Sequence, residues 1–247
     1  MKDVVKQIAR ALLPEPALKG IQQWRSRRVD SKFASLTPEQ TFERIYAEGF
    51  WGVGEDGRGS SGNGSNQSGV VIPYVEAVVA FLRSLERPLR LVDLGCGDFA
   101  VGQQVVPAVD HYVGCDIVAS VIEENRRRWG SPAIDFVQLN LINDPLPPGG
   151  VATLRQVLQH LSNAQIAAIL PKLAIYDHVI ITEHVPAGEF PANIDKPNGP
   201  GTRLSRNSGV VIGRQPFGMP GFTPRPLLKI DCDGDLISTT VWSRTRE

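Results

Sequence analysis

The stretch from Leu89 to Asp98 combines an apolar run, a carboxylate and two glycines. The apolar residues show no helical period, which is typical of a buried strand. Gly95 and Gly97 carry no Cβ, so a bound molecule could approach the backbone closely at this turn. A helix that begins at Asp98 or Phe99 would direct its free N–H groups to the same place. The stretch therefore predicts a strand followed by a ligand-binding turn.

A second carboxylate stands at the end of the next predicted strand, which runs from His111 to Asp116. A carboxylate in this place can accept hydrogen bonds from both hydroxyls of a ribose. Asp116 could instead cap the helix that follows it. Ala100 stands where a dinucleotide fingerprint has its third small residue, so the glycine turn alone does not exclude a nicotinamide cofactor. The Asp93 carboxylate before the glycines suits an ammonium group better than a pyrophosphate.

Several segments together resemble the class I S-adenosylmethionine (SAM) dependent methyltransferases. The turn Val92-Asp93-Leu94-Gly95-Cys96-Gly97 resembles the first motif of that family, and Arg155-Gln156-Val157-Leu158-Gln159-His160 resembles the fourth. Trp51-Gly52 and the segment Ser61–Ser65 resemble a glycine-rich part that the family carries before its first strand. The resemblance covers roughly residues 40–245 and implies an enzyme that moves a methyl group from SAM to a nucleophilic oxygen or nitrogen.

The resemblance also implies a set of cofactor-binding residues. They come from the segment before the first strand, the glycine turn, the ends of the second and third strands and the fourth motif: Trp51, Ser65, Asp93, Gly95, Cys96, Gly97, Asp116, Ile117, Asn140, Leu141 and Gln156. The segment Ser61–Ser65 would fold over the bound cofactor, although its composition is also that of a flexible linker.

Asn140 departs from the family pattern. An aspartate commonly follows the third strand in the family and accepts a hydrogen bond from the adenine amino group. An asparagine can still accept through its carbonyl oxygen. Asp144 stands nearby in the sequence and is an alternative acceptor.

Residues that could assist the chemistry lie after the fourth predicted strand and at the end of the fifth. A hydroxyl acceptor needs a base, and the candidates are His160, His184 and Glu183. Arg203 and Arg206, in the proline- and glycine-rich segment 186–225, could hold a polar or anionic part of the acceptor. His160 could instead pack at a helix start, and both arginines could simply be solvated.

These residues favour O-methylation of a small molecule or sugar. N-methylation of a small-molecule or protein amine is the alternative, because a neutral amine needs less help from a base. A protein that binds SAM without catalysis and a nicotinamide oxidoreductase are further alternatives. No cluster with the spacing of metal ligands is evident, so no metal is expected.

The elements that position these residues form an α/β pattern. Strands are expected at 89–94, 111–116, 134–140, 151–154 and 178–185, and Asp233-Gly234 indicates a hairpin between 227–231 and 236–242. Helices are expected at 2–13, after Thr37, from Pro73, at 99–106, at 118–129 and after Ser162. The resemblance implies a three-layer doubly wound sheet, parallel except for the C-terminal hairpin.

The chain is expected to divide into two parts. Residues 1–72 would hold N-terminal helices and the cofactor-covering segment, and residues 73–247 would form the SAM-binding domain. Residues 186–225 would form a lid over the acceptor, with a short strand near 203–212.

The composition narrows the possible partners. The 247 residues include 26 Lys and Arg and 26 Asp and Glu, so the formal net charge is zero. A neutral chain lacks a strong electrostatic footprint for nucleic acid, and a small-molecule or glycan acceptor is expected. Three cysteines form no disulfide framework, and no signal peptide or membrane span is visible, so a cytoplasmic location is expected. The sequence carries no indication of the oligomeric state.

Overall fold

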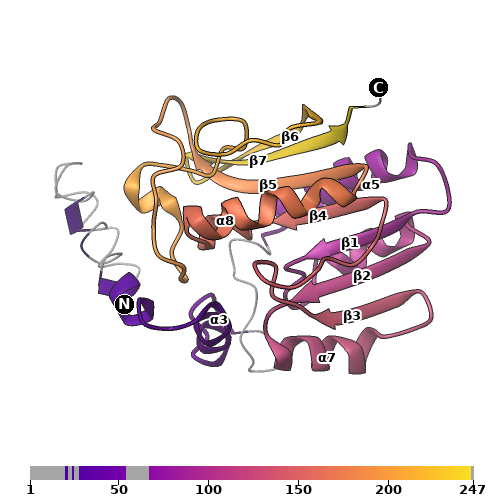
Figure 1. The fold of residues 1–247 in the computed structure, drawn as a ribbon, viewed down its shortest axis with the longest axis horizontal. Coiled ribbons are helices and arrows are strands. Elements are labelled where there is room, and N and C mark those ends of the chain that lie inside the picture. Colours follow the sequence, from indigo (N-terminus) through magenta and orange to yellow (C-terminus); the bar gives the residue numbers. More distant parts are fainter. Residues whose placement is uncertain (1–19, 22–23, 25–27, 54–66, 246–247) are drawn as a thin grey trace.

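One seven-stranded sheet forms the centre of the structure, a computed structural model that describes residues 20–21, 24, 28–53 and 67–245. The strand order is β3-β2-β1-β4-β5-β7-β6 (Figure 1). The first five strands run parallel, and β7 is antiparallel to both β5 and β6. Their bounds are β1 Arg90–Leu94, β2 His111–Asp116, β3 Ile134–Gln138, β4 Val151–Arg155, β5 His178–Pro186, β6 Phe222–Cys232 and β7 Asp235–Arg244. The predicted parallel sheet with its antiparallel hairpin is confirmed.

Helices cover both faces of this sheet, which gives three layers. One apolar cluster packs Val78, Val105 and Ile122 against one face, and another packs Ile166 and Leu173 against the other. The helices of the first face are α5 Ser68–Arg83, α6 Gly102–Val105 with the 3-10 turn η1 Val106–Ala108, and α7 Ala119–Trp129. Those of the second face are α8 Asn163–Ile169 and the 3-10 helix η3 Leu170–Ile175.

Helix α3, Pro38–Ala47, lies at the carboxyl ends of β1 to β3 (Figure 1). Its start is set locally, because Thr37 and Gln40 form the predicted capping box. Ser162 and Gln165 form the same motif at the start of α8. Both predicted helix starts are therefore confirmed.

Two predicted helices have different bounds in the structure. Helix α5 begins at Ser68 rather than Pro73, because Val70 is buried against Cys232 and Ile237 of the hairpin. The helix after the glycine turn begins at Gly102, because the backbone of Phe99 is left-handed, with φ at 62°.

The segment between β5 and β6 also differs from the prediction. Residues 203–212 form no strand; Arg203–Arg206 forms the 3-10 turn η4, capped by the Thr202 side chain. Strand β6 begins at Phe222, so the connecting segment, called the lid below, covers 187–221. The predicted division into 1–72 and 73–247 stays a prediction, and α5 runs across that position.

Some predictions concern residues outside the described ranges. The helix at 2–13, the segment Ser61–Ser65 and the cofactor residue Ser65 lie there. Of the helices that are described, none combines the length and the apolar character needed to cross a membrane.

Candidate active site

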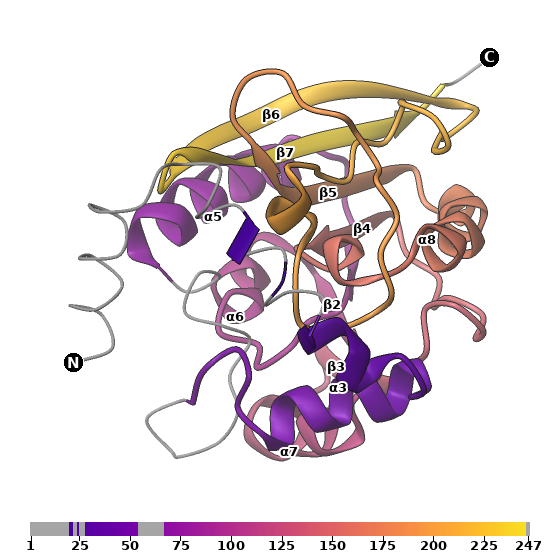
Figure 2. The same cartoon turned by 90° about the vertical axis from the view of Figure 1, so that its left-hand side faces the viewer.

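A cavity at the carboxyl ends of β1, β2 and β4 brings most of the predicted cofactor residues together. Figure 2 looks onto this edge of the sheet, with α3 and the lid in front of it. The cavity wall includes Trp51, Asp93, Gly95, Cys96, Gly97, Asp116, Ile117, Asn140, Leu141 and Gln156. The order of strands thus places residues from five separate segments around one space. That these residues bind a cofactor stays a prediction.

The glycine turn is held tightly between β2 and the start of the fourth motif. The N–H groups of Gly95 and Cys96 both donate to the Cys115 carbonyl, at 2.8 and 2.9 Å. Gly95 has φ at 92°, and a Cβ built there would lie 2.4 Å from Val157 Cγ2. Any side chain at this position would meet both a strained backbone and a steric clash.

Asp116 is buried at the tip of β2 and organises the turn. Its Oδ2 accepts a hydrogen bond from Gly97 N at 3.0 Å, and its Oδ1 accepts one from Val118 N at 3.1 Å. Burial raises the pKa of this carboxyl. The N-cap of α7 is Val118, so Asp116 does not cap that helix. Each carboxylate oxygen has further lone-pair capacity, which leaves room for the two hydroxyls of a ribose.

Asp93 is held by two neutral donors that sequence reasoning missed. Tyr112 Oη donates to its Oδ2 at 2.6 Å, and Thr153 Oγ1 donates to its Oδ1 at 2.8 Å. Burial raises the pKa of Asp93. Strand pairing opposes Asp93 to Thr153 and Leu91 to Tyr112, so both donors lie on adjacent strands. The sequence signal for Thr153 is its spacing of two from Arg155 on β4, which becomes informative only once the strand order is known.

Asn140 already uses its side chain within the protein. Its Oδ1 accepts from Ile142 N at 2.8 Å, and its Nδ2 donates to the Glu39 carboxylate of α3. Asp144 Oδ2 accepts from Asn140 N at 2.8 Å. Both predicted acceptors therefore shape the turn after β3, and an adenine amino group would share the Asn140 carbonyl oxygen with Ile142.

Aromatic side chains form the wall of the cavity opposite the sheet. Phe42 and Tyr46 come from α3, and Trp51 follows that helix. The Trp51 ring lies 4.7 Å from the His160 ring between centroids, and its Nε1 donates to Pro200 O of the lid at 3.0 Å. This wall would suit a flat or apolar part of a bound molecule.

His160 is the one predicted catalytic residue that lines this cavity. It ends the 3-10 turn η2, Leu158–His160, and its Nε2 lies 3.3 Å from Gln159 Nε2. Burial, together with the positive charge of Lys196, lowers the pKa of His160 to about 3. The imidazole is therefore neutral at physiological pH.

Glu183 does not reach the cavity. Its carboxylate accepts from Leu158 N at 3.0 Å and from Gln159 N at 2.9 Å, so it holds the turn that carries His160. Burial raises the pKa of Glu183 to about 8. Its side chain lies in the wall of a separate groove between β5, β7 and the lid. In the structure this carboxylate holds the η2 turn, and a catalytic role for Glu183 stays a prediction.

His184 lies outside the cavity wall as well. It follows Glu183 on β5, so its side chain points to the opposite face of the sheet. Burial lowers its pKa, against the opposing charges of Asp235 and Asp233 in the hairpin. Direct contact with a molecule in the cavity is not supported by this position.

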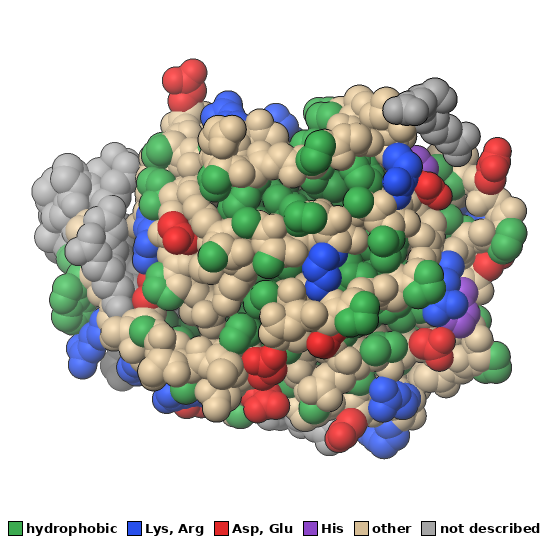
Figure 3. All heavy atoms as spheres, in the orientation of Figure 1, with side chains coloured by type: hydrophobic (Ala, Val, Ile, Leu, Met, Phe, Trp, Pro, Cys, Tyr) green, Lys and Arg blue, Asp and Glu red, His purple; other side chains and the backbone are tan. Residues whose placement is uncertain are grey.

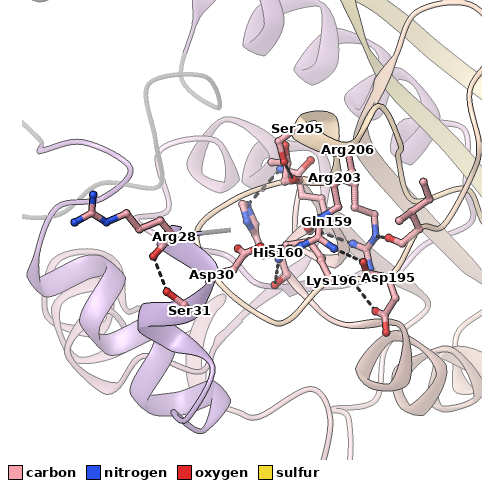
Figure 4. A network of polar contacts seen from close by, with 12 residues as sticks. Arg28, Asp30, Ser31, Gln159, His160, Asp195, Lys196, Arg203, Ser205 and Arg206 are labelled. Carbon is pink, nitrogen blue, oxygen red and sulfur yellow. Dashed lines mark hydrogen bonds and ion pairs between the residues drawn. The ribbon is translucent and has the colours of Figure 1, made fainter. Parts of the chain in front are cut away.

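Arg203 was predicted to contact the acceptor, but its side chain is 0% exposed. The guanidinium donates to the carbonyl oxygens of Leu158, Gln159, Leu161 and Ile194 and to Asn163 Oδ1. These bonds fix the lid to the segment that carries His160 (Figure 4). An arginine in a segment rich in proline and glycine is expected to be exposed, and only the tertiary structure shows its burial.

The Arg206 side chain also contacts other groups within the chain. Its Nη2 lies 2.8 Å from Asp30 Oδ2, and its Nη1 donates to Asp195 O at 2.5 Å. Neither arginine lines the cavity, so the predicted substrate contacts are not supported. Both residues belong to the network drawn in Figure 4, which joins residues 28–31, 159–160 and the lid.

The tip of the lid contacts two sides of the cavity. Gly199 N and Lys196 Nζ donate to His160 O at 3.0 and 3.2 Å, and Asn198 Nδ2 donates to Thr41 Oγ1 of α3 at 2.8 Å. Lys196 is buried, and burial lowers its pKa to about 7. The lid thus bridges η2 and α3 at the edge of the cavity.

Comparison with solved structures identifies the fold. The chain resembles a 1,6-didemethyltoxoflavin-N1-methyltransferase from Burkholderia thailandensis with a TM-score of 0.56 and 15% identity, covering 84% of this chain and 87% of that one. It resembles a magnesium protoporphyrin IX methyltransferase from Synechocystis with a TM-score of 0.52 and 17% identity, covering 91% and 97%. It resembles the N-methyltransferase NodS from Bradyrhizobium japonicum with a TM-score of 0.50 and 11% identity, covering 73% and 90%.

The sequence itself matches neither a family model nor a curated protein. At these levels of identity the likeness concerns the fold. The chain therefore has the fold of the class I methyltransferases, as the resemblance implied.

Proposed function

We propose that this protein is a SAM-dependent methyltransferase. The observation that carries the proposal is the single cavity that gathers the glycine turn, Asp93 and Asp116 at the carboxyl edge of the sheet. Ligands bind at this edge in open α/β sheets. The structures named above contain SAM or S-adenosylhomocysteine (SAH), which supports the same cofactor here.

The described residues fit such a cofactor. Asp116 would accept from the ribose hydroxyls, and the cofactor could lie against the backbone of Gly95 and Gly97, which carry no side chains and line the cavity. The apolar side chains of Ile117, Leu139 and Leu141 would face the adenine. When bound, SAM supplies an activated methyl group, so the protein mainly has to align donor and acceptor.

The acceptor in this proposal is a hydroxyl of a small molecule or sugar. His160 would accept the hydroxyl hydrogen, because its neutral ring lies in the cavity wall beside Trp51. The aromatic wall would hold the body of the acceptor. The acceptor is expected to be small because the tip of the lid contacts both α3 and His160 at the edge of the cavity.

An amine acceptor is the second candidate, and one observation favours it. The low pKa of His160 makes its ring a weak base. A neutral amine already presents a lone pair and needs no proton transfer before it attacks. Two of the structures named above are N-methyltransferases by name.

Methyl transfer can be measured with SAM and panels of small hydroxyl and amine compounds, with SAH formation as the readout. We expect turnover with a hydroxyl compound and transfer of the labelled methyl to its oxygen. Methylation of amines alone would establish the second candidate. SAH binding with no turnover on either panel would contradict the enzymatic proposal, and preferential binding of NADH over SAH would contradict the cofactor.

A further inference from the structure

The Gln159 side chain connects β5 to the His160 ring. Its Oε1 accepts a hydrogen bond from His184 N of β5 at 3.1 Å, and its Nε2 lies 3.3 Å from His160 Nε2. The Gln159 backbone is held from the same strand, because its N–H donates to the Glu183 carboxylate at 2.9 Å. Gln159 is buried, and both its backbone and its side chain are therefore fixed by β5. Figure 4 draws Gln159 and His160 in one network.

These contacts settle the orientation of the Gln159 amide. A backbone N–H can donate only to the oxygen of an amide group, so the bond from His184 N identifies which end of the Gln159 amide is Oε1. The NH2 group then faces His160 Nε2, and it has donors but no acceptor to offer the ring. The amide therefore donates, and His160 Nε2 accepts.

An accepting Nε2 sets the tautomer of the His160 ring. Burial, together with the positive charge of Lys196, lowers the pKa of His160 to about 3, so the ring is neutral and carries one hydrogen. Because the Nε2 lone pair is in use as an acceptor, this hydrogen is on Nδ1. Nδ1 is buried, so Nε2 is the nitrogen through which the ring can meet a molecule in the cavity.

We propose that Gln159 is a positioning residue that keeps the lone pair of His160 on Nε2 and holds the place of the acceptor hydroxyl there. The inference rests on the proposed function, because it assigns a role at the same site. The bond between Gln159 and His160 is long for an N–H donor, so a hydroxyl can replace it. The hydroxyl hydrogen would then pass to Nε2 while the oxygen takes the methyl group of SAM, which leaves as SAH. The ring would end with one hydrogen on each nitrogen.

Nuclear magnetic resonance of the protein, with its histidine rings labelled with the heavy nitrogen isotope, reads the tautomer near neutral pH without any ligand. The chain contains four histidines, and the signals that His160→Gln lacks belong to His160. The test variant is Gln159→Met, which keeps the length of the side chain and removes its amide. Lys196→Met is the matched control, since Lys196 Nζ donates to the His160 backbone oxygen and not to the ring.

The wild type should carry the ring hydrogen on Nδ1 and a hydrogen-bonded lone pair on Nε2. Gln159→Met should no longer keep the hydrogen on Nδ1 alone, and Lys196→Met should match the wild type. Turnover of the hydroxyl compound found with the panel above should fall on the order of 10- to 100-fold in Gln159→Met. In the His160→Gln background the same change should cost nothing further, because Gln159 acts through the ring.

Other results separate the two proposals. A wild-type ring with its hydrogen on Nε2 would overturn the role of Gln159, even if Gln159→Met failed to fold. An unchanged tautomer in Gln159→Met, an equal change in Lys196→Met, or an additive loss of turnover in the double variant would overturn it too. A ring hydrogen on Nδ1 with no SAH formed from any compound of the panel would instead overturn the proposed function.

Discussion

A side chain at Gly95 should weaken both the stability of the protein and its binding of SAH. Gly95→Ala would combine a positive φ with a contact of 2.4 Å to Val157 Cγ2. The strained backbone alone costs about 1–3 kcal/mol, and the clash adds to it. Gly188→Ala is the control, because Gly188 has φ at 74° and no heavy atom lies within 4 Å of the place that its Cβ would take. Urea unfolding and SAH titration should show a larger loss for Gly95→Ala in both quantities. Equal losses in the two variants would contradict the tight packing of the turn.

A catalytic role for His160 predicts slower methyl transfer when this side chain is replaced. Under the O-methylation proposal, His160→Gln should lower turnover of the hydroxyl acceptor by about 10²–10⁴-fold, the usual effect of removing a general base, and leave SAH affinity intact. Because the folded pKa is about 3, the wild-type rate should not fall between pH 8 and pH 5 through protonation of this ring. Steady-state rates across this pH range are the measurement. Wild-type turnover by His160→Gln would exclude the base and favour an amine acceptor.

The lowered pKa of His160 also predicts how the stability of the protein depends on pH. The pKa of His160 is lowered from 6.5 to about 3 on folding, so below pH 6.5 the unfolded chain binds a proton that the folded chain does not. The wild type should therefore lose stability as the pH falls from 6.5 toward 3, by up to about 1.4 kcal/mol per pH unit from this group. His160→Gln should show a shallower loss. His111→Gln is the control, since His111 contacts Asp135 near the surface. Parallel pH profiles for the wild type and His160→Gln, measured by urea unfolding, would contradict the burial of a neutral ring.

The lid is held in place by a buried cation rather than by regular secondary structure. Arg203→Leu would leave the carbonyl oxygens of Gln159, Leu161 and Ile194 without the donor that the guanidinium supplies. Each buried group that loses its partner costs about 1–3 kcal/mol, so we expect a loss of at least about 3 kcal/mol in the free energy of unfolding. Arg206→Leu removes one ion pair, to the buried Asp30 carboxylate, and one bond to Asp195 O, so it should cost less than Arg203→Leu. A loss in Arg203→Leu no larger than that in Arg206→Leu would contradict this account of the lid.

Elements whose signals are local could be predicted from the sequence. The capping boxes at Thr37 and Ser162 lie within four residues, and the structure has both. The start of α5 could not be predicted, because it depends on Val70 packing against the distant hairpin. The lid was mistaken for a segment with a strand because the burial of Arg203 involves residues 158–163, far away in the sequence.

Some residues of the candidate site could likewise be predicted from local patterns in the sequence, and others could not. The glycine turn and Asp116 could be found from a short motif and one strand spacing, and both line the cavity. The side chains of Tyr112, Thr153 and Arg155 meet Asp93 only through strand order and register. Glu183 and His184 were grouped with the site because they end a parallel strand, but strand alternation and the hold of Glu183 on η2 direct them elsewhere.

On the face of the molecule shown in Figure 3, charged side chains do not gather into a patch of one sign. Acidic and basic side chains are interspersed over the face shown in Figure 3, and the formal net charge of the chain is zero. Among the described residues, polar and aromatic side chains gather in the cavity at the carboxyl edge of the sheet. We therefore expect this cavity to bind SAM.

Calorimetric titration of SAH into the wild type, Asp116→Ala and Asp135→Ala would show whether this cavity binds the cofactor. Asp116 lines the cavity at the tip of β2, whereas Asp135 is exposed on β3 and contacts His111. Loss of the ribose hydrogen bonds should cost about 1.5–3 kcal/mol each, so Asp116→Ala should bind SAH at least about 10-fold more weakly. Asp135→Ala should match the wild type. Unchanged SAH affinity in Asp116→Ala, or no binding by the wild type, would contradict the claim.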